Sequence, residues 1–499
     1  MHLPPTVLCA LLLSLCGVPR SIAATPLRPN IILIFADDLG WKDVGYNGSE
    51  FIETPVLDRL AKEGMVFTEA YATGANCAPS RASLMSGTYT PRHGLFAVGA
   101  TDRGPKNHQR LVAVPKQDWL EQNVLTIADA LKGAGYATGH FGKWHLAGNP
   151  TDQGFDLSFN SFGDGEVAEG VQENRAGPPS DPKGVFVLTR KAGEFMEASK
   201  GRPFFCYLAH HAPHVPLQAR PETLEKFQAK APGGKDNDIL YAACVYDFDE
   251  SVGILLAKLK ELGIEENTHL VFTSDNGAAP GVAQEPLRGA KGSLYEGGIR
   301  VPFIVRWPGV TKPGSTSDVP VTNVDLFPTF LAAAGTPVPD GKVLDGENLR
   351  PLLDGSGTLQ RNAIFWHFPC YLNGPVNRGR KLDVLTGFRS RPVSVIRKGD
   401  WKLHLFHEEW QLDGGRDKLD TNHAVELYNL AGDIGEQNDL ANTQTAKRDE
   451  LLDDLLAWFK ATDAPLPSEP NPQYDPAAVA PGGGDKTKKS RQANQTTHE

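Results

Sequence analysis

The chain has 499 residues, of which 40% are hydrophobic and 22% are charged, and its formal net charge is −10. This length allows a large core and two domains, and the composition is that of a globular protein, neither fibrous nor disordered. The acidic balance argues against nucleic acid as a partner, although a few local cations can still bind a small anionic substrate.

The N-terminus has the pattern of a targeting segment. An apolar run over residues 6–18 precedes the small residues Ser21, Ala23 and Ala24. This pattern predicts a signal peptide over residues 1–24, although its first residues lack Lys and Arg. We therefore expect an exported protein, periplasmic or secreted. No later segment has the ~20 apolar residues of a membrane span, so we expect none.

Two other interpretations of this segment are weaker. A buried first strand is disfavoured because a better strand pattern follows at Ile31. A lipoprotein anchored at Cys16 is disfavoured because Leu15, a large residue, stands where a small one is expected.

Short apolar runs alternate with helical patterns between residues 25 and 360. Strand patterns occur at 30–36, 136–141, 203–209 and 269–274. Helical patterns occur at 54–64, at 125–131 and in the segment that ends before Gly263. In the first of these helices we expect Thr54 as N-cap and Pro55 at the first position. Apolar strands alternating with helices predict an α/β domain, with a large, mostly parallel sheet flanked by helices.

The pattern changes after residue 360. Short strand patterns occur at 363–368, 392–397, 401–406 and 425–430, and a helical pattern follows at 451–459. The turn at Gly399 predicts a hairpin between the second and third strands. We expect a smaller antiparallel α+β domain over residues 361–462. Residues 463–499 are rich in Pro, Gly, Lys and Gln, which predicts a disordered tail.

Two apolar strand patterns run directly into carboxylates. The first ends in Asp37-Asp38, and the strand at 269–274 ends in Asp275-Asn276-Gly277. Sites in open α/β sheets form at the carboxyl ends of strands. Three carboxylates and an amide there predict an all-oxygen site for a hard cation, Ca²⁺ more readily than zinc. The alternative for either motif alone is loop aspartates that cap helices.

A distinctive motif, CAPSRASLMSG, occupies residues 77–87. Pro79 suits a first helical turn, which places Cys77 at or just before a helix N-terminus, where an anion is favoured. Arg81, one turn on, can reach back toward residue 77. Chemistry alone allows a cysteine nucleophile of low pKa. The alternative is a cysteine that only fills space.

Three further segments carry cations and histidines. The strand that ends in residues 135–145 (GYATGHFGKWH) delivers Lys143 and His145, which alternation would put on one side of the chain. The segment 210–216 (HHAPHVP) predicts a loop whose prolines restrict the backbone and which presents His214. A zinc site is disfavoured because no cysteine or suitably spaced histidine accompanies these histidines. The glycine-rich segment 288–302 can bring Lys291 close to an oxyanion.

In this order and spacing the motifs resemble the sulfatase family of the alkaline-phosphatase superfamily. Residues 77–81 are similar to its C-x-P-S-R signature, with Ser86-Gly87 where Thr-Gly is common, and residues 135–145 are similar to its second signature, G-Y-x-T-x-x-x-G-K-x-H. The resemblance runs from about Asn30 to the C-terminal helix. It implies an alkaline-phosphatase-like fold and a hydrolase of sulfate esters.

The resemblance also implies a mechanism. A formylglycine-generating enzyme would oxidise Cys77 to formylglycine, with Pro79 and Arg81 needed for its recognition, and the hydrated aldehyde would attack sulfur. The remaining roles follow from the same resemblance: Asp37, Asp38, Asp275 and Asn276, together with residue 77, would hold Ca²⁺; Arg81 would hold the diol; Lys143 and Lys291 would neutralise the sulfuryl oxygens; His214 would act as general acid; and His145 would deprotonate the diol.

Two rival functions stay open at this level. One is a phosphodiesterase or phosphonate monoester hydrolase with the same nucleophile, and the other is an inactive homologue that binds sulfated glycans. We expect a sulfated carbohydrate or aryl sulfate as substrate of an exported bacterial enzyme. The candidate specificity segments are residues 96–117, 162–182 and 366–391, the last mixing aromatic and cationic side chains, which suits a sulfated sugar but also fits ordinary loop packing.

Overall fold

The structure, a computed structural model, describes residues 28–160, 178–375 and 380–478. The expected signal peptide lies outside the described residues, as do positions 479–499 of the expected tail and most of the 162–182 segment. Within the described ranges, no helix is both long enough and apolar enough to cross a membrane.

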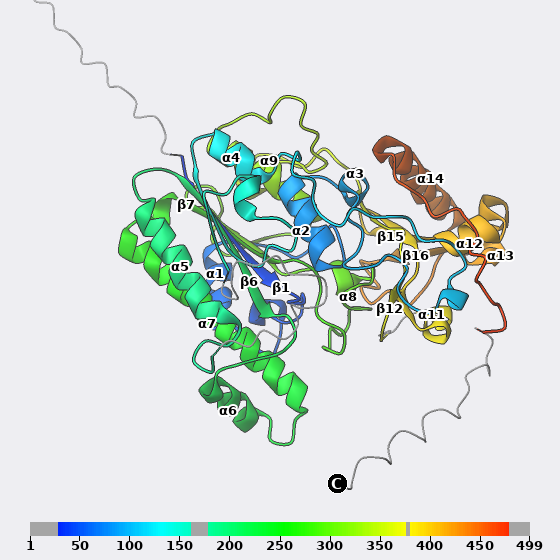
Figure 1. Cartoon of the computed structure of the whole chain (residues 1–499), viewed down its shortest axis with the longest axis horizontal. Coiled ribbons are helices and arrows are strands. Elements are labelled where there is room, and N and C mark those ends of the chain that lie inside the picture. Colours follow the sequence, from blue (N-terminus) through cyan, green and yellow to red (C-terminus); the bar gives the residue numbers. More distant parts are fainter. Residues whose placement is uncertain (1–27, 161–177, 376–379, 479–499) are drawn as a thin grey trace, which may run out of the picture.

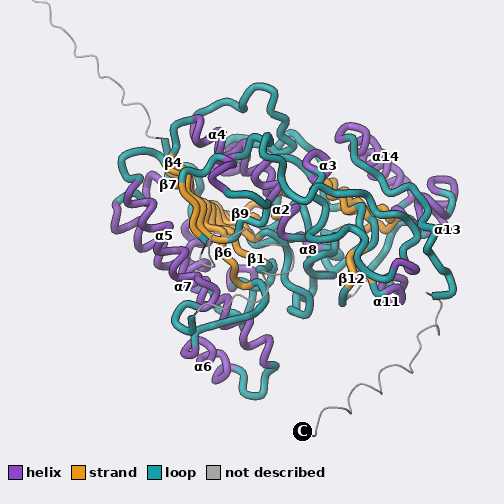
Figure 2. The backbone as a smooth tube through the Cα atoms, in the orientation of Figure 1, coloured by secondary structure: helices purple, strands orange, loops and turns teal. Residues whose placement is uncertain are grey.

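A large sheet forms the centre of the molecule (Figure 2). Its strand order is β5-β4-β6-β1-β7-β8-β2-β9. The strands β5, β4, β6, β1 and β7 are parallel to one another, whereas β8 is antiparallel to both β7 and β2. The bounds are β1 Asn30–Asp37, β2 Met65–Phe67, β4 Ala137–Gly142, β5 Leu157–Phe159, β6 Phe204–Pro213, β7 Thr268–Ser274, β8 Phe303–Arg306 and β9 Ser315–Ser317. The expected mostly parallel sheet is confirmed.

Helices cover both faces of this sheet (Figures 1 and 2). Ile31 and Leu33 of β1 belong to the core on one face, and Ile32 and Ile34 to the core on the other. This alternation explains the uninterrupted apolar run in β1, because both sides of a central parallel strand are buried. One face carries α1 (Pro55–Glu63), α5 (Val185–Ala198) and α7 (Asp236–Leu262), and the other α2 (Cys77–Ser86), α4 (Ile127–Gly133) and α9 (Leu326–Ala334).

The start of α1 differs from the expectation. The helix begins at Pro55, but the hydroxyl of Thr54 accepts a hydrogen bond from Gly45 N and donates to Asp58 instead of capping the helix. The first free amides of α1, those of Val56 and Leu57, donate to the carboxylate of Asp249 on α7 at 2.9 and 2.8 Å. A carboxylate from a packed helix therefore replaces the local cap.

The C-terminal part forms a second, antiparallel sheet of order β11-β14-β15-β16. Its strands are β11 Ile364–Phe368, β14 Val393–Lys398, β15 Trp401–Phe406 and β16 Val425–Asn429. Helix α14 (Thr445–Thr462) packs against it through Leu451, Leu452 and Leu455 (Figure 1). A smaller antiparallel sheet with a helix was expected here and is confirmed.

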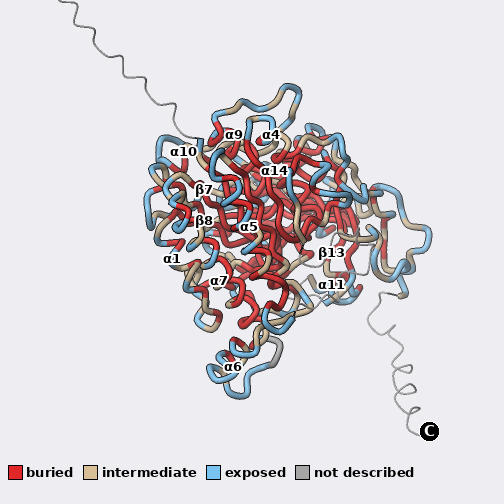
Figure 3. Tube along the Cα trace, turned by 60° about the vertical axis from the view of Figure 1, so that its left-hand side comes forward, coloured by how far each residue is buried: buried red, intermediate tan, exposed pale blue. Residues whose placement is uncertain are grey.

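Shorter elements join the two sheets. Lys402 of β15 lies 2.9 Å from both Glu296 and Glu436, and all three side chains are buried. Buried residues fill the interior of the molecule, and exposed ones lie around its outside (Figure 3). The remaining elements are β3 Ala70–Tyr71, α3 Thr90–His93, α6 Pro221–Lys230, α8 Glu296–Ile299, β10 Val321–Thr322, α10 Arg350–Leu353, β12 Leu372–Asn373, α11 Lys381–Thr386, β13 Phe388–Ser390, α12 His407–Leu412 and α13 Leu419–Asn422.

Residues 463–478 differ from the disorder expected from their composition. Glu469 O accepts a hydrogen bond from Val112 N at 2.8 Å, and Asn471 N donates to Arg110 O at 2.9 Å. The ring of His367 also bonds to Pro465 O at 3.0 Å. This stretch is held by backbone pairing with a distant loop, which the composition of the stretch itself does not indicate.

Candidate active site

Four neighbouring parallel strands bring polar side chains to one edge of the large sheet. Because β4, β6, β1 and β7 are parallel, their carboxyl ends lie at the same edge. The residues at or just beyond these ends are Asp37 and Asp38 after β1, Lys143 and His145 after β4, His214 after β6, and Asp275 and Asn276 after β7.

The histidine segment is not the loop that we expected. β6 continues through residues 210–213, and a bulge with extra residues on the β6 side pairs Asp37 with Pro213. The histidines do not converge: His210 packs on Phe248 with ring centroids 5.0 Å apart, and His211 bonds to Asn160. Only His214 reaches the carboxylates, so these residues form no shared zinc site.

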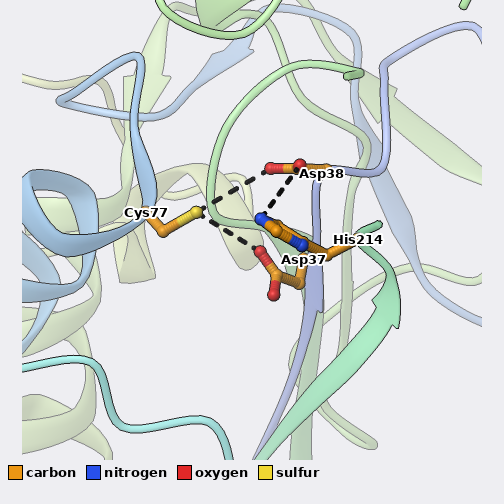
Figure 4. Close-up of side chains that lie close together, drawn as sticks. All are labelled: Asp37, Asp38, Cys77 and His214. Atoms are coloured by element: carbon orange, nitrogen blue, oxygen red, sulfur yellow. Dashed lines mark hydrogen bonds and ion pairs between the residues drawn. The ribbon is translucent and has the colours of Figure 1, made fainter. Parts of the chain in front are cut away.

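Cys77 lies against the two carboxylates of β1 (Figure 4). It is the first residue of α2, and its Sγ is 3.4 Å from Oδ1 of Asp37 and 3.8 Å from Oδ1 of Asp38. His214 Nε2 lies 3.7 Å from Oδ2 of Asp38. One atom from each of these four side chains lies within 4.8 Å of all the others.

The surroundings of Cys77 do not favour a thiolate. The side chain is only 1% exposed, and burial, with the negative charge of Asp275, raises the pKa of the Cys77 thiol far above its usual value. The positive charges of Lys143 and Lys291, which lower this pKa, do not offset these effects. A reactive cysteine of low pKa, one of the possibilities left open by the sequence, therefore does not fit this environment.

Arg81 is held next to the site by several hydrogen bonds. Its Nη2 and Nε donate to Oδ2 of Asp275 at 2.8 and 3.1 Å, and its Nη1 donates to Lys143 O at 3.0 Å. The hydroxyl of Tyr207 lies 3.3 Å from the same Nη1. Tyr207 was not singled out from the sequence, because a tyrosine inside an apolar strand carries no sign that its hydroxyl contacts an arginine.

Two lysines neutralise the β1 carboxylates. Lys143 Nζ lies 2.6 Å from Oδ2 of Asp37, and Lys291 Nζ lies 2.8 Å from Oδ1 of Asp38. Burial raises the pKa of Asp37, but the charges of Lys143 and His214 outweigh it and hold that pKa well below its usual value. Burial lowers the pKa of Lys291, but the charge of Asp38 outweighs it, so the pKa is raised. Both lysines stay cationic at neutral pH.

The donors of this cluster suit a hard cation such as Ca²⁺. Asn276 Nδ2 donates to Oδ1 of Asp38 at 2.7 Å, while its buried Oδ1 has no hydrogen-bond partner. Burial, together with the charge of Asp37, raises the pKa of Asp275 to about 6. An unsatisfied amide oxygen beside crowded carboxylates is the environment that a divalent cation would relieve. The residues present therefore fit Ca²⁺.

His145 enters the site by an irregular backbone turn. β4 ends at Gly142, and His145 has φ 62, so the expected alternation of Lys143 and His145 along an extended chain is wrong. Its buried Nδ1 has no hydrogen-bond partner. Burial, followed by the positive charges of Lys143 and Arg81, holds the pKa of His145 well below its usual value. His145 is therefore neutral at pH 7 and can accept a proton.

A buried lysine that we did not predict lies near these groups. Lys183 is 4% exposed, has φ 60, and donates to Pro216 O at 3.2 Å, just beyond His214. Burial lowers the pKa of Lys183, while the charges of Asp37 and Asp38 act in the opposite direction. The sequence holds no signal for this residue, because its place depends on tertiary packing.

The family model described as Sulfatase matches residues 29–336. The chain belongs to the sulfatase family. A second model, described as N-sulphoglucosamine sulphohydrolase, C-terminal, matches residues 290–384 of this sulfatase. The resemblance seen in the motifs is thereby confirmed, and the enzyme is a hydrolase of sulfate esters.

Curated relatives align over most of the sulfatase. Arylsulfatase A of Homo sapiens is 31% identical, covering 88% of this chain and 90% of its own. N-acetylgalactosamine-6-sulfatase of Mus musculus is 34% identical over 79% of this chain and 75% of its own. A sulfatase of Formosa agariphila is 30% identical over 88% of this chain and 90% of its own.

Solved structures share the fold of this sulfatase. The crystal structure of Ps i-CgsB matches with a TM-score of 0.69 and 31% identity, covering 89% of this chain and 94% of that chain. The same protein is also solved in complex with k-i-k-neocarrahexaose. A phosphonate monoester hydrolase of Agrobacterium radiobacter matches with a TM-score of 0.61 and 21% identity, covering 87% of this chain and 96% of that chain, which indicates a common fold alone.

Proposed function

We propose that this sulfatase removes sulfate from a sulfated carbohydrate, with formylglycine at position 77 and Ca²⁺ as cofactor. The observation that carries the proposal is the burial of Cys77 at the start of α2, between Asp37 and Asp38. A thiol of raised pKa in that place is a poor nucleophile but a suitable precursor for one.

The two groups absent from the chain have defined chemistry. Hydrated formylglycine, made from Cys77 by the formylglycine-generating enzyme, supplies a hydroxyl nucleophile. Asp37, Asp38, Asp275 and Asn276, together with residue 77, would hold Ca²⁺, and the ion would supply positive charge to the sulfate oxygens.

The remaining groups of the site serve charge and proton transfer. Arg81, fixed by Asp275, orients residue 77 through its guanidinium. Lys143 and Lys291 stabilise the negative charge that spreads over the sulfuryl oxygens, and such electrostatic stabilisation is usually the largest catalytic contribution. His214 donates a proton from Nε2 to the leaving alcohol. His145, neutral and with a free Nδ1, accepts a proton from residue 77.

A carbohydrate substrate is supported by the named relatives. Ps i-CgsB, 31% identical, binds a neocarrahexaose, and the mouse relative is named for N-acetylgalactosamine 6-sulfate. The apolar N-terminal segment supports export to the periplasm or the medium.

The test is a comparison of initial rates on defined sulfated oligosaccharides, an aryl sulfate and an aryl phosphodiester. The protein is co-produced with a formylglycine-generating enzyme, and Cys77→Ala, produced in the same way, is the matched control. We expect sulfate release from at least one oligosaccharide. A dominant diester rate would favour the phosphodiesterase alternative, and glycan binding without turnover would favour an inactive homologue.

A further inference from the structure

Two segments far apart in the sequence meet beside Lys291. Gly292 has φ +87, and a Cβ there would lie 2.4 Å from Leu372 Cδ2 of β12 and 3.0 Å from Arg389 Cδ of β13. A Cβ on Gly104 would lie 2.5 Å from the ring of Phe388. The absence of side chains at these glycines lets the loop around Arg103 and the β12–β13 pair pack closely beside the loop that carries Lys291.

Arg389 is fixed next to the catalytic cluster. Its Nη1 donates to Lys291 O at 3.1 Å, and the side chain of that lysine reaches Asp38. Its buried Nε has no hydrogen-bond partner. Burial, and then the like charge of Arg103, lowers the pKa of Arg389, whereas the charge of Asp38 raises it. Arg103 and Arg389 are therefore electrostatic neighbours of the site.

The absence of a counter-ion distinguishes the half-buried Arg389 and the exposed Arg103 from the buried arginine nearby. Arg391, two residues further on, bonds to Asp383 at 2.8 Å and also to Glu408 and Glu409. Arg103 and Arg389 have no carboxylate within ion-pair distance in the described ranges. Arginine removed from water without an anion is costly, so a half-buried, unpaired guanidinium indicates that a ligand supplies the negative charge.

We propose that Arg389 and Arg103 bind a second anionic group of the substrate, a sulfate ester or a carboxylate, next to the sulfate that is cleaved. This inference rests on the proposed function. The fork of guanidinium donors matches the oxygens of both anions, and the Nε of Arg389 has no hydrogen-bond partner. The substrate class thus narrows to saccharides that carry two anionic groups close together.

A purely structural role for Arg389 makes a different prediction. Its hydrogen bond to Lys291 O helps to hold that lysine, so a structural loss would lower turnover of every sulfate ester by the same factor. Loss of a subsite would instead reduce the preference for dianionic over monoanionic substrates. The ratio of kcat/KM between paired substrates separates the two roles.

The experiment uses matched saccharide pairs and an aryl sulfate. The 6-sulfates of galactose, N-acetylgalactosamine and glucosamine are each compared with a derivative that bears a second sulfate, and with a disaccharide that bears a neighbouring uronate. These two arms distinguish sulfate from carboxylate as the second anion. The variants are Arg389→Ala and Arg103→Ala; the control is Arg202→Ala, an exposed arginine directly before β6, at the opposite edge of the sheet.

We expect wild-type enzyme to prefer the dianionic member of at least one pair by about tenfold or more. Each arginine variant should lower that ratio toward one, by about tenfold where the wild-type preference is tenfold, and Arg202→Ala should leave it unchanged. Arg103 is exposed, so its variant tests the subsite even if Arg389→Ala folds poorly. Three outcomes would overturn the inference: equal rates within every substrate pair, an unchanged kcat/KM ratio in both variants, or turnover of the aryl sulfate alone. Absence of all sulfatase activity would instead refute the proposed function.

Discussion

Nη2 of Arg81 lies 2.8 Å from Oδ2 of Asp275, and neither side chain is exposed to solvent. The pair joins α2, which begins with Cys77, to the end of the central strand β7. The position of the proposed nucleophile therefore depends on an ion pair that water does not screen.

Replacement of Arg81 should destabilise the fold as well as the site. Arg81→Met leaves the carboxylate of Asp275 buried without its cation, and we expect a loss of about 3–5 kcal/mol in the free energy of unfolding. Urea denaturation measures this loss. The exposed Arg59, 3.8 Å from Glu63, is the control, and Arg59→Met should change stability by less than about 1 kcal/mol. Equal effects of the two substitutions would contradict the interpretation of Arg81–Asp275 as a buried, structurally required pair.

Conversion of Cys77 should be visible by mass. Peptides containing residue 77 should be about 18 Da lighter than the encoded sequence when the protein is co-produced with a formylglycine-generating enzyme. Cys77→Ala should abolish turnover, whereas Ca²⁺ binding, measured by calorimetry, should persist through the oxygen ligands. Full activity of protein that retains an unmodified thiol at residue 77 would disprove the proposed nucleophile.

Calcium should stabilise the folded protein. A cation that binds the native carboxylate cluster and not the unfolded chain raises the free energy of unfolding by about 2.7 kcal/mol at 100 times its Kd. We expect chelation to lower Tm and added Ca²⁺ to restore it. Asp38→Ala should abolish this dependence, while Asp453→Ala, at an exposed site on α14, should preserve it. A Tm that is insensitive to Ca²⁺ would rule out the proposed site.

His214 should matter most for poor leaving groups. As general acid it contributes about 10²–10⁴-fold, so His214→Ala should lose that much on a sugar sulfate and less on a nitrophenyl sulfate, whose phenolate leaves without a proton. Burial lowers the pKa of His214, and Asp37 and Asp38 only partly offset this effect. Its protonated fraction therefore falls as pH rises through a value below the ordinary range. The kcat/KM on sugar sulfate should decrease toward alkaline pH, and an equal loss on both substrates in His214→Ala would argue against this role.

Asp249 should make stability depend on pH. Burial raises the pKa of Asp249 in the folded state to about 7. The hydrogen bonds from the amides of Val56 and Leu57 lower this pKa but do not outweigh burial. The folded state thus keeps a proton that the unfolded chain loses near pH 4, so this group stabilises folding at low pH and loses its contribution as pH rises toward 7.

In the wild type, Asp249 should lower the free energy of unfolding by an amount of the order of a few kcal/mol between pH 4 and 7. Asp249→Asn should remove this contribution, so the free energy of unfolding should depend less on pH. Urea denaturation at several pH values measures it, with the exposed Asp453→Asn as control. A slope identical to wild type in Asp249→Asn would show that the carboxyl does not titrate in this way.

Local patterns in the sequence were enough to predict the four central strands β4, β6, β1 and β7 and to indicate candidate reactive groups at their ends. β1 and β7 are apolar runs buried on both faces, and each runs directly into carboxylates. Because parallel strands align their carboxyl ends, it could be expected that Asp37 and Asp275 would lie close together, although 238 positions separate them. The motif that begins at Cys77 likewise indicated a helix N-terminus.

Other features depended on contacts that no local pattern records. The bulge that extends β6 aims His214 at Asp38 while His210 packs on Phe248, so neighbouring histidines have unrelated surroundings. Thr54 suggested a local cap, yet Asp249 from α7 binds the amides of α1. In each case the outcome depends on which partner the packing brings within hydrogen-bond distance.

The sequence by itself determined which groups are available for chemistry: the cysteine, the carboxylates, the lysines and the histidines. The tertiary structure alone decided that Arg389 lies against Lys291 without a carboxylate partner in the described part of the chain, whereas Arg391 has three. The physical reason is that charge pairing and burial are properties of packed neighbours. Arg389 lies within β13, whereas Arg391 lies beyond the end of that strand and meets carboxylates of α11 and α12.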